Sequence, residues 1–232
     1  MTVAPDAATR LWVCDLHTHT ACSRDSLTGP AEFLAACRRK GIDRVAVTDH
    51  NTVEGALRLK ELDPERVIVG EEVRTTHGEL LAYFLRSGIA PDQSPQATID
   101  AVRAQDGVVG AAHPLDRFRR EALGREALLP IIDQLDFLEV LNARCILAAD
   151  NQAARALAAE TGTLMVAGSD AHSPWEVGRA VTILPPFDSP ATFLASLESA
   201  QLRGRPSPFW IHLWSTYAKL ARRLGLASTP GA

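Results

Sequence analysis

The sequence lacks several features that would place it in a large class of proteins. No apolar run is long enough to span a bilayer, and the N-terminus has no charged segment followed by an apolar core. The four cysteines, Cys14, Cys22, Cys37 and Cys145, show no Cys-x-x-Cys spacing, which argues against a zinc ribbon and a disulfide framework. We therefore expect a cytoplasmic protein with no membrane span, whose cysteines are mostly small core residues.

Positive charge and aromatic rings are also scarce. With 24 Lys and Arg against 28 Asp and Glu, the net charge is -4, and aromatic residues make up 6% of the chain. Broad affinity for nucleic acid is therefore not indicated, because it needs basic surfaces and stacking rings. A length of 232 residues suits one α/β barrel domain. We expect that domain over residues 11–204, after a flexible N-terminus (1–10) and before a C-terminal segment (205–232).

Histidines and carboxylates recur at the ends of apolar runs. The β-prone run 11–14 leads to His17 and His19, which share one face of a strand because side chains alternate. Four later runs end in Asp49-His50, Glu71-Glu72, His113 and Asp170-Ala171-His172. Imidazole and carboxylate are common ligands of zinc and related ions. Because five strands would rarely end in such ligands by chance, the pattern predicts a metal site.

Strand and helix patterns alternate along the chain. Strands are expected near 11–14, 44–48, 67–69, 79–85, 108–112, 137–141 and 164–167, with helices near 30–40, 53–62, 91–105 and 148–160. Such alternation indicates parallel βα units. The turn at residues 75–78 is the one place where we expect a hairpin.

Six motifs, in this order, resemble the PHP (polymerase and histidinol phosphatase) family of metal-dependent phosphoesterases. They are Asp15-Leu16-His17-Thr18-His19-Thr20, Ser23-x-Asp25-Ser26, Thr48-Asp49-His50-Asn51-Thr52, Gly70-Glu71-Glu72, His113-Pro114 and Gly168-Ser169-Asp170-Ala171-His172. The resemblance covers roughly residues 11–184. It implies an α/β fold, a distorted (β/α)7-type barrel with a metal cluster at the C-terminal ends of the strands.

The resemblance also implies a ligand set for two or three divalent ions, which would be zinc, manganese or iron. One ion would be held by His17, His19, Glu72 and Asp170, a second by Glu72 as a bridge together with His113, and a third by Asp25, His50 and His172. Many family members carry a histidine where this chain has Glu79, so Glu79 or His77 would complete the second site. A carboxylate there favours manganese or iron. Asp15 or Asp49 could instead orient a neighbouring histidine.

The activity that the resemblance implies is hydrolysis of a small phosphorylated metabolite or nucleotide by a metal-activated water. His17, Asp170 and His172 are the expected catalytic residues, and the general acid stays unassigned. Arg119 and Arg144 are the preferred candidates for gripping the substrate phosphate. The alternatives are a nuclease acting on short oligonucleotides, a non-catalytic PHP interaction module, and hydrolysis of a non-phosphate ester. The sequence gives no argument about oligomeric state.

The last part of the chain has a different pattern. From Phe209 to Leu226, large apolar residues recur at helical spacing, with basic residues between and beside them. This predicts an amphipathic helix. We expect it to dock on the barrel or on a partner subunit rather than to lie in a membrane interface.

Overall fold

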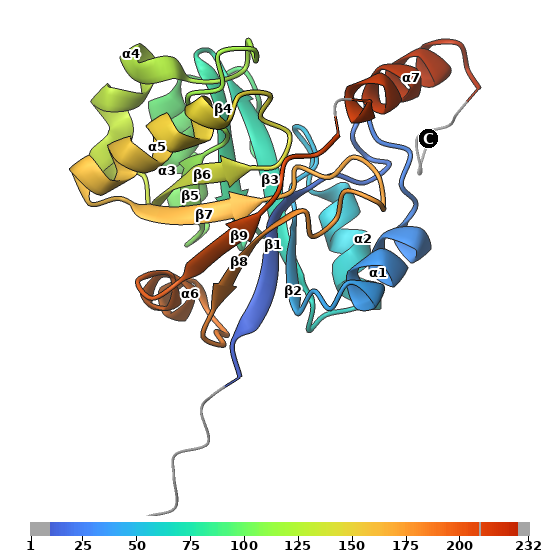
Figure 1. Ribbon diagram of the computed structural model, residues 1–232, viewed down its shortest axis with the longest axis horizontal. Coiled ribbons are helices and arrows are strands. Elements are labelled where there is room, and N and C mark those ends of the chain that lie inside the picture. Colours follow the sequence, from blue (N-terminus) through green and yellow to red (C-terminus); the bar gives the residue numbers. More distant parts are fainter. Residues whose placement is uncertain (1–9, 209, 227–232) are drawn as a thin grey trace, which may run out of the picture.

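The structure is a computed structural model that describes residues 10–208 and 210–226 (Figure 1). The expected flexible N-terminus, residues 1–10, therefore lies outside the described residues except for Arg10. Phe209 and residues 227–232 of the expected C-terminal segment lie outside them as well. No helix in the described ranges is long and apolar enough to cross a membrane.

Strands and helices alternate through most of the described chain, as the sequence pattern predicts. The first half contains β1 (Trp12–Thr18), α1 (Pro30–Arg39), β2 (Arg44–Val47), α2 (Glu54–Leu62), β3 (Val67–Thr75), β4 (Gly78–Tyr83), α3 (Pro95–Arg103) and β5 (Val108–Ala111). The second half contains α4 (Gly124–Leu128), the 3-10 helix η1 (Leu129–Gln134), β6 (Phe137–Asn142), α5 (Ala148–Thr161), β7 (Leu164–Gly168), β8 (Ala180–Leu184), α6 (Pro190–Leu197), β9 (Gln201–Gly204) and α7 (Ile211–Arg223).

The strands of the described residues form one sheet in the order β7-β6-β5-β4-β3-β2-β1-β8-β9. Strands β1, β2 and β3 are parallel, as are β5, β6 and β7, and β4 runs antiparallel between the two sets. A bridge between Thr18 and Ala171 links the ends of β1 and β7, so the first seven strands curl into a nearly closed barrel. The expected α/β barrel is confirmed, and so is the hairpin, which joins β3 to β4.

The sheet is larger than the seven strands expected. Strand β8 pairs antiparallel with β1, and β9 pairs antiparallel with β8. The sequence pattern also missed α4, η1 and α6. Strand β9 gives little signal because its four residues, Gln-Leu-Arg-Gly, are mostly exposed and lack apolar alternation. An edge strand of this kind is held by its backbone ladder rather than by buried side chains.

Local signals fix several helix ends as expected. Ser94 Oγ accepts a hydrogen bond from the backbone N–H of Ala97 (3.1 Å), and Pro95 follows as the first residue of α3. Beyond the end of α1, Gly41 has a φ of +67°, which a residue without Cβ adopts at little cost. These ends set where β2 and β5 begin, and therefore where their C-terminal ligands lie.

Two apolar clusters surround the sheet. The larger one packs α1, α2, α3 and α5 against the outside of the barrel. The second, inside the barrel, includes Ile68 of β3, Leu81 of β4, Phe137 of β6 and Val166 of β7, and α6 packs against it. Residues two or four apart share a strand face, so β3, β4 and β6 carry Glu72, Glu79 and Glu139 on the inner face beyond the apolar layer. Asp170 follows the end of β7.

Candidate metal centre

The end of β1 supplies two histidines whose tautomers follow from their neighbours. His17 Nδ1 lies 3.0 Å from Glu139 Oε1, and an ionised carboxylate can only accept, so Nδ1 carries the proton. Ser23 gives its hydroxyl proton to Asp49 Oδ1 (2.6 Å) and so accepts from His19 Nδ1 (3.1 Å). The neutral form of each histidine therefore keeps a lone pair on Nε2. Those two nitrogens are free to bind a cation.

Three buried ligand atoms, those of His17, His19 and Glu72, form a compact candidate group, and Asp170 Oδ1 lies beside it. Glu72 Oε2 lies 3.3 Å from the Nε2 atoms of both His17 and His19. Asp170 Oδ1 lies 3.8 Å from His17 Nε2 and 3.3 Å from His19 Nε2. Ligand atoms about 2.1 Å from a tetrahedral ion would be roughly 3.4 Å apart, which the three separations of 3.3 Å match.

A second group is built around the other oxygen of Glu72. Glu72 Oε1 lies 3.0 Å from His113 Nε2, which is also 3.8 Å from Glu79 Oε2. Glu79 Oε1 lies 3.5 Å from His50 Nδ1. His77, by contrast, is exposed in the β3–β4 turn, where its Nδ1 lies 2.8 Å from the Thr76 hydroxyl. The structure thus brings Glu79, and not His77, to this position.

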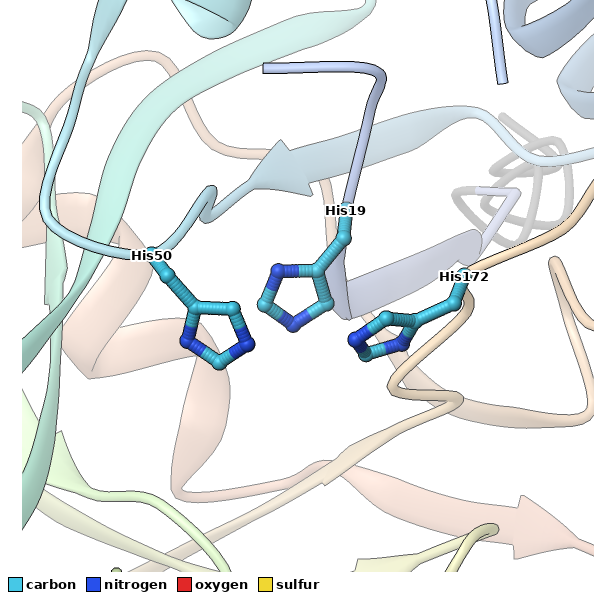
Figure 2. A group of neighbouring side chains, drawn as sticks. All are labelled: His19, His50 and His172. Atoms are coloured by element: carbon cyan, nitrogen blue, oxygen red, sulfur yellow. The ribbon is translucent and has the colours of Figure 1, made fainter. Parts of the chain in front are cut away.

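A third group gathers on the opposite side of His19. His172 Nε2 lies 3.2 Å from Asp25 Oδ1, and His50 Nε2 lies 3.7 Å from Asp25 Oδ2. Figure 2 shows the rings of His19, His50 and His172 turned toward one another from three separate segments. Each of the three offers a nitrogen within 4.8 Å of the others'. His19 therefore lies between the first and third groups.

Several atoms in these groups have no hydrogen-bond partner in the protein and could instead bind divalent cations. Five ligand atoms are buried without a hydrogen-bond partner: His17 Nε2, His19 Nε2, Asp25 Oδ1, Glu72 Oε2 and Asp170 Oδ1. Buried polar atoms are almost always satisfied, and leaving one unsatisfied costs free energy. Mixed imidazole and carboxylate donors match zinc, manganese and iron. Cations bound at the first and third groups would satisfy all five.

Backbone strain occurs at two of these positions. Asp170 has a φ of +53° and His113 a φ of +29°, and side-chain-bearing residues rarely adopt such angles. Asp170 is held there because its N–H donates to the His17 carbonyl (2.8 Å), while the His19 N–H donates to the Ala171 carbonyl (2.8 Å). These bonds close the barrel between β1 and β7. Strain of this kind is typical of functional positions.

Burial and neighbouring charges shift the pKa values of two proposed histidine ligands. Burial lowers the pKa of His19, and the neighbouring histidines lower it further, so its lone pair is available. Burial also favours neutral His17, but Glu139, Glu72 and Asp170 overcome it and hold the pKa of His17 well above its usual value. Without metal, His17 therefore binds a proton. Metal binding at Nε2 would release that proton.

The two predicted substrate arginines lie at the centre, but in different settings. Arg119 donates to Asp170 Oδ2, and although burial opposes ionisation, Arg119 and His17 hold the pKa of Asp170 well below its usual value. Arg144 is nearly buried, with Nη1 2.7 Å from His172 Nδ1 and Nε 3.1 Å from Glu176 Oε1. Most of its guanidinium is therefore occupied by protein groups.

Glu139 contacts two of the proposed ligands, although the sequence pattern did not point to it. Glu139 receives His17 Nδ1–H on Oε1, and its Oε2 accepts from the His113 backbone N–H (2.8 Å) and from Asn142 Nδ2 (3.0 Å). The signal was present, because Glu139 interrupts an apolar strand two residues after inward-facing Phe137. Of the two aspartates proposed to orient a histidine, Asp49 reaches His19 through Ser23.

Asp15, the other aspartate, has a different environment. It accepts from the Ser169 N–H (2.9 Å) and hydroxyl (2.6 Å) and from the Gly178 N–H (2.7 Å). Burial raises its pKa to about 6. Asp15 therefore holds the segment after β7 against β1. Cys22 is half-buried and belongs to none of the candidate ligand groups among the described residues.

A cleft of about 650 Å³ opens onto the centre. Asp25, His50, Glu79 and His172 line it, so the second and third ligand groups face a space accessible to a small molecule. Five basic residues also line it: Arg24, Arg74, Arg119, Arg144 and Lys219. Four carboxylates line it as well, those of Asp25, Glu79, Asp116 and Glu121. The cationic side chains on its walls suit an anionic ligand that approaches bound cations.

Fold and site together define an α/β-barrel protein with candidate metal-binding groups at the C-terminal ends of its strands. Residues 15–138 match the family model described as PHP domain, and residues 148–202 match the one described as PHP-associated. This chain belongs to the PHP domain family, whose members include metal-dependent phosphoesterases.

Two relatives come from Methanocaldococcus jannaschii. Uncharacterized protein MJ0417 is 31% identical over 231 residues, covering 92% of this chain and 92% of its own. Uncharacterized protein MJ1587 is 38% identical over 143 residues, covering 56% of this chain and 81% of its own. The similarity to MJ0417 therefore extends over most of the chain, but neither name gives an activity.

Solved structures share the fold at low identity. A two-domain protein from Bacteroides vulgatus, containing a predicted PHP-like metal-dependent phosphoesterase, has a TM-score of 0.69 at 17% identity, over 88% of this chain and 68% of its own. The lesion-specific endonuclease PfuEndoQ from Pyrococcus furiosus has a TM-score of 0.62 at 16% identity, over 83% of this chain and 57% of its own. At such identities the likeness shows the fold alone.

Proposed function

We propose that this protein is a metal-dependent phosphoesterase that hydrolyses a small phosphorylated metabolite or nucleotide. The observation that carries the proposal is the set of unsatisfied buried ligand atoms beneath a cleft that five cationic side chains line. Divalent ions held by these ligands would activate the attacking water and offset the charge of the phosphate. Family membership supports the same class of reaction.

The residues of this chain take separate roles in the proposal. His17, His19, Glu72 and Asp170 would hold the first ion, and Glu72 would share a second with His113 and Glu79. Asp25, His50 and His172 would hold the third. We assign catalytic roles to His17, Asp170 and His172, because they belong to the ligand groups whose ions would activate the attacking water.

The arginines would position the substrate. Arg119 is partly exposed in the cleft, and a guanidinium can grip phosphate through two parallel hydrogen bonds. Arg144 also borders the cleft, but its contacts to His172 and Glu176 make it primarily a positioning residue. His172 Nδ1 lies near Arg144, which only donates, and 2.9 Å from the Asp170 carbonyl, which only accepts. One nitrogen can satisfy only one of these two partners.

The test uses metal-stripped protein refilled with manganese, zinc or iron. Turnover of p-nitrophenyl phosphate or its bis-ester should return with metal and disappear in His17→Ala. A matched control is His77→Ala, since His77 is exposed in the β3–β4 turn and should leave both turnover and metal content unchanged. Absence of turnover with metal demonstrably bound would refute the proposal and favour a non-phosphate ester or a non-catalytic module.

A second candidate is a nuclease acting on short oligonucleotides, favoured by the fold likeness to an endonuclease. Single-stranded substrates are usually held by basic grooves with stacking rings. Among the described residues lining the cleft, Phe118 is the one aromatic residue. We therefore rank the small substrate first. Cleavage of short oligonucleotides faster than p-nitrophenyl esters would reverse that order.

A further inference from the structure

Helix α7 forms one wall of the cleft. Its residues Ser215, Thr216 and Lys219 line the cleft together with the proposed ligands. The helix begins at Ile211, beyond residue 202, where the second of the two family-matched segments ends. Figure 1 shows α7 above the β1–α1 side of the barrel. This wall therefore comes from a part of the chain that neither family model describes.

Hydrogen bonds fix α7 against the metal centre at both of its ends. Near its start, Arg144 Nη2 donates to Ser215 Oγ (2.6 Å) and to the Ile211 carbonyl (3.3 Å). Near its end, Arg222 Nη2 donates to the carbonyls of Ser26 (2.8 Å) and Ala21. These carbonyls belong to the loop that carries Asp25. The helix is thus placed relative to the same loop that supplies a proposed ligand.

Of the five basic residues that line the cleft, Arg24 and Lys219 form the fewest interactions with the described part of the protein. Arg74 forms two hydrogen bonds with Asp92, and Arg119 and Arg144 bind buried carboxylates. Lys219 makes one ion pair, Nζ to Asp25 Oδ2 at 3.2 Å, and its side chain is 61% exposed. Arg24 is exposed and forms no ion pair with any residue in the ranges 10–208 and 210–226.

Arg24 and Lys219 border the same end of the cleft. Arg24 directly precedes Asp25 in the chain, and Lys219 contacts the Asp25 carboxylate from α7. Asp25 would share its charge with a metal ion in the loaded protein, which weakens its hold on Lys219. The long, exposed lysine side chain can then turn toward another anion.

We propose that Arg24 and Lys219 form an anion-binding subsite at the mouth of the cleft, which takes a second anionic group of the substrate. The inference rests on the proposed function, because it places the ester phosphate at the metal centre. It narrows the substrate to phosphate esters that carry a further carboxylate or phosphate group. Helix α7 is then a specificity element, since it supplies Lys219.

The test measures binding separately from hydrolysis. Manganese-loaded full-length protein is titrated with benzylphosphonate and with carboxylated benzylphosphonates whose methylene spacer is varied. The best carboxylated compound should bind about tenfold more tightly, because a partly exposed charge-assisted hydrogen bond contributes on that order. Lys219→Gln should remove most of this difference and leave benzylphosphonate binding unchanged. Arg24→Gln should reduce the difference as well.

Arg223→Gln is the matched control, since Arg223 is an exposed cation of α7 that does not line the cleft. It should keep the tenfold difference. A Lys219→Gln protein that binds both compounds equally less well, or a wild type that does not distinguish them, would overturn the subsite. If the carboxylated compound binds more tightly but no phosphate ester is hydrolysed, the subsite is supported and the proposed function is refuted. If a phosphate ester is hydrolysed but the two compounds bind equally well, the proposed function is supported and the subsite is refuted.

Discussion

Glu139→Gln should weaken metal binding although Glu139 is not itself a proposed ligand. Its two oxygens serve three donors: His17 Nδ1 at 3.0 Å, the His113 N–H at 2.8 Å and Asn142 Nδ2 at 3.0 Å. A glutamine keeps one acceptor oxygen and places an NH₂ group at the other position. At least one buried donor then faces another donor. His17 also loses the carboxylate that fixes its tautomer.

The size of the effect follows from these contacts. An unpaired buried donor costs about 1–3 kcal/mol. Loss of a partner behind a metal-binding histidine typically reduces metal affinity about 10- to 100-fold, which corresponds to roughly 1.4–2.8 kcal/mol. The cost of the unpaired donor and the loss of metal affinity are therefore of similar size. We expect a decrease in manganese or zinc affinity of that size, with turnover largely recovered at saturating metal.

Competition with a chromophoric chelator would measure the affinity, and Glu71→Gln is the matched control. Glu71 is also a buried glutamate, on β3, but its Oε2 accepts from the Ile89 N–H (2.8 Å). Among the described residues, its side chain forms no hydrogen bond or ion pair with the proposed ligands, and Glu71 precedes the proposed ligand Glu72 on the opposite face of β3. Equal metal affinities for Glu139→Gln and Glu71→Gln would refute the argument that Glu139 positions His17.

Three further predictions concern stability and docking. Gly168→Ala would place a Cβ 2.4 Å from His17 Cβ, so we expect a loss of about 1–3 kcal/mol in urea unfolding together with reduced metal content, and unchanged values would contradict this. Burial raises the pKa of Glu71 from 4.5 to about 7, so its contribution to stability is complete below pH 4.5 and is lost as the pH rises through 7. Glu71→Gln should therefore be more stable than wild type at pH 8, by at most about 3 kcal/mol, and should lose that advantage near pH 4; a pH-independent difference would contradict the assignment. Arg144→Lys cannot reproduce the guanidinium contact with Ser215, so α7 should be cut faster by protease, and an unchanged cleavage rate would show that other contacts hold the helix.

The sequence predicts the barrel well because its signals are local. An apolar strand that ends in a histidine or carboxylate specifies both a buried segment and a polar end, and parallel strands bring those ends together. The structure accordingly gathers His17, Glu72 and Asp170, although their roles as ligands stay predictions. Strand β9 has no comparable signal, because a short exposed edge strand is specified by its neighbour.

Long side chains are less predictable, because the chain position of a residue does not fix where its charged end lies. Arg144 follows a strand that ends at the centre, which suggested a phosphate grip. Its guanidinium instead reaches Glu176 and Ser215 and so connects α7 to the ligand His172. Lys219, from a segment expected only to dock, reaches Asp25. The ligands follow from local pattern, whereas the cleft that selects the substrate depends on contacts between distant segments.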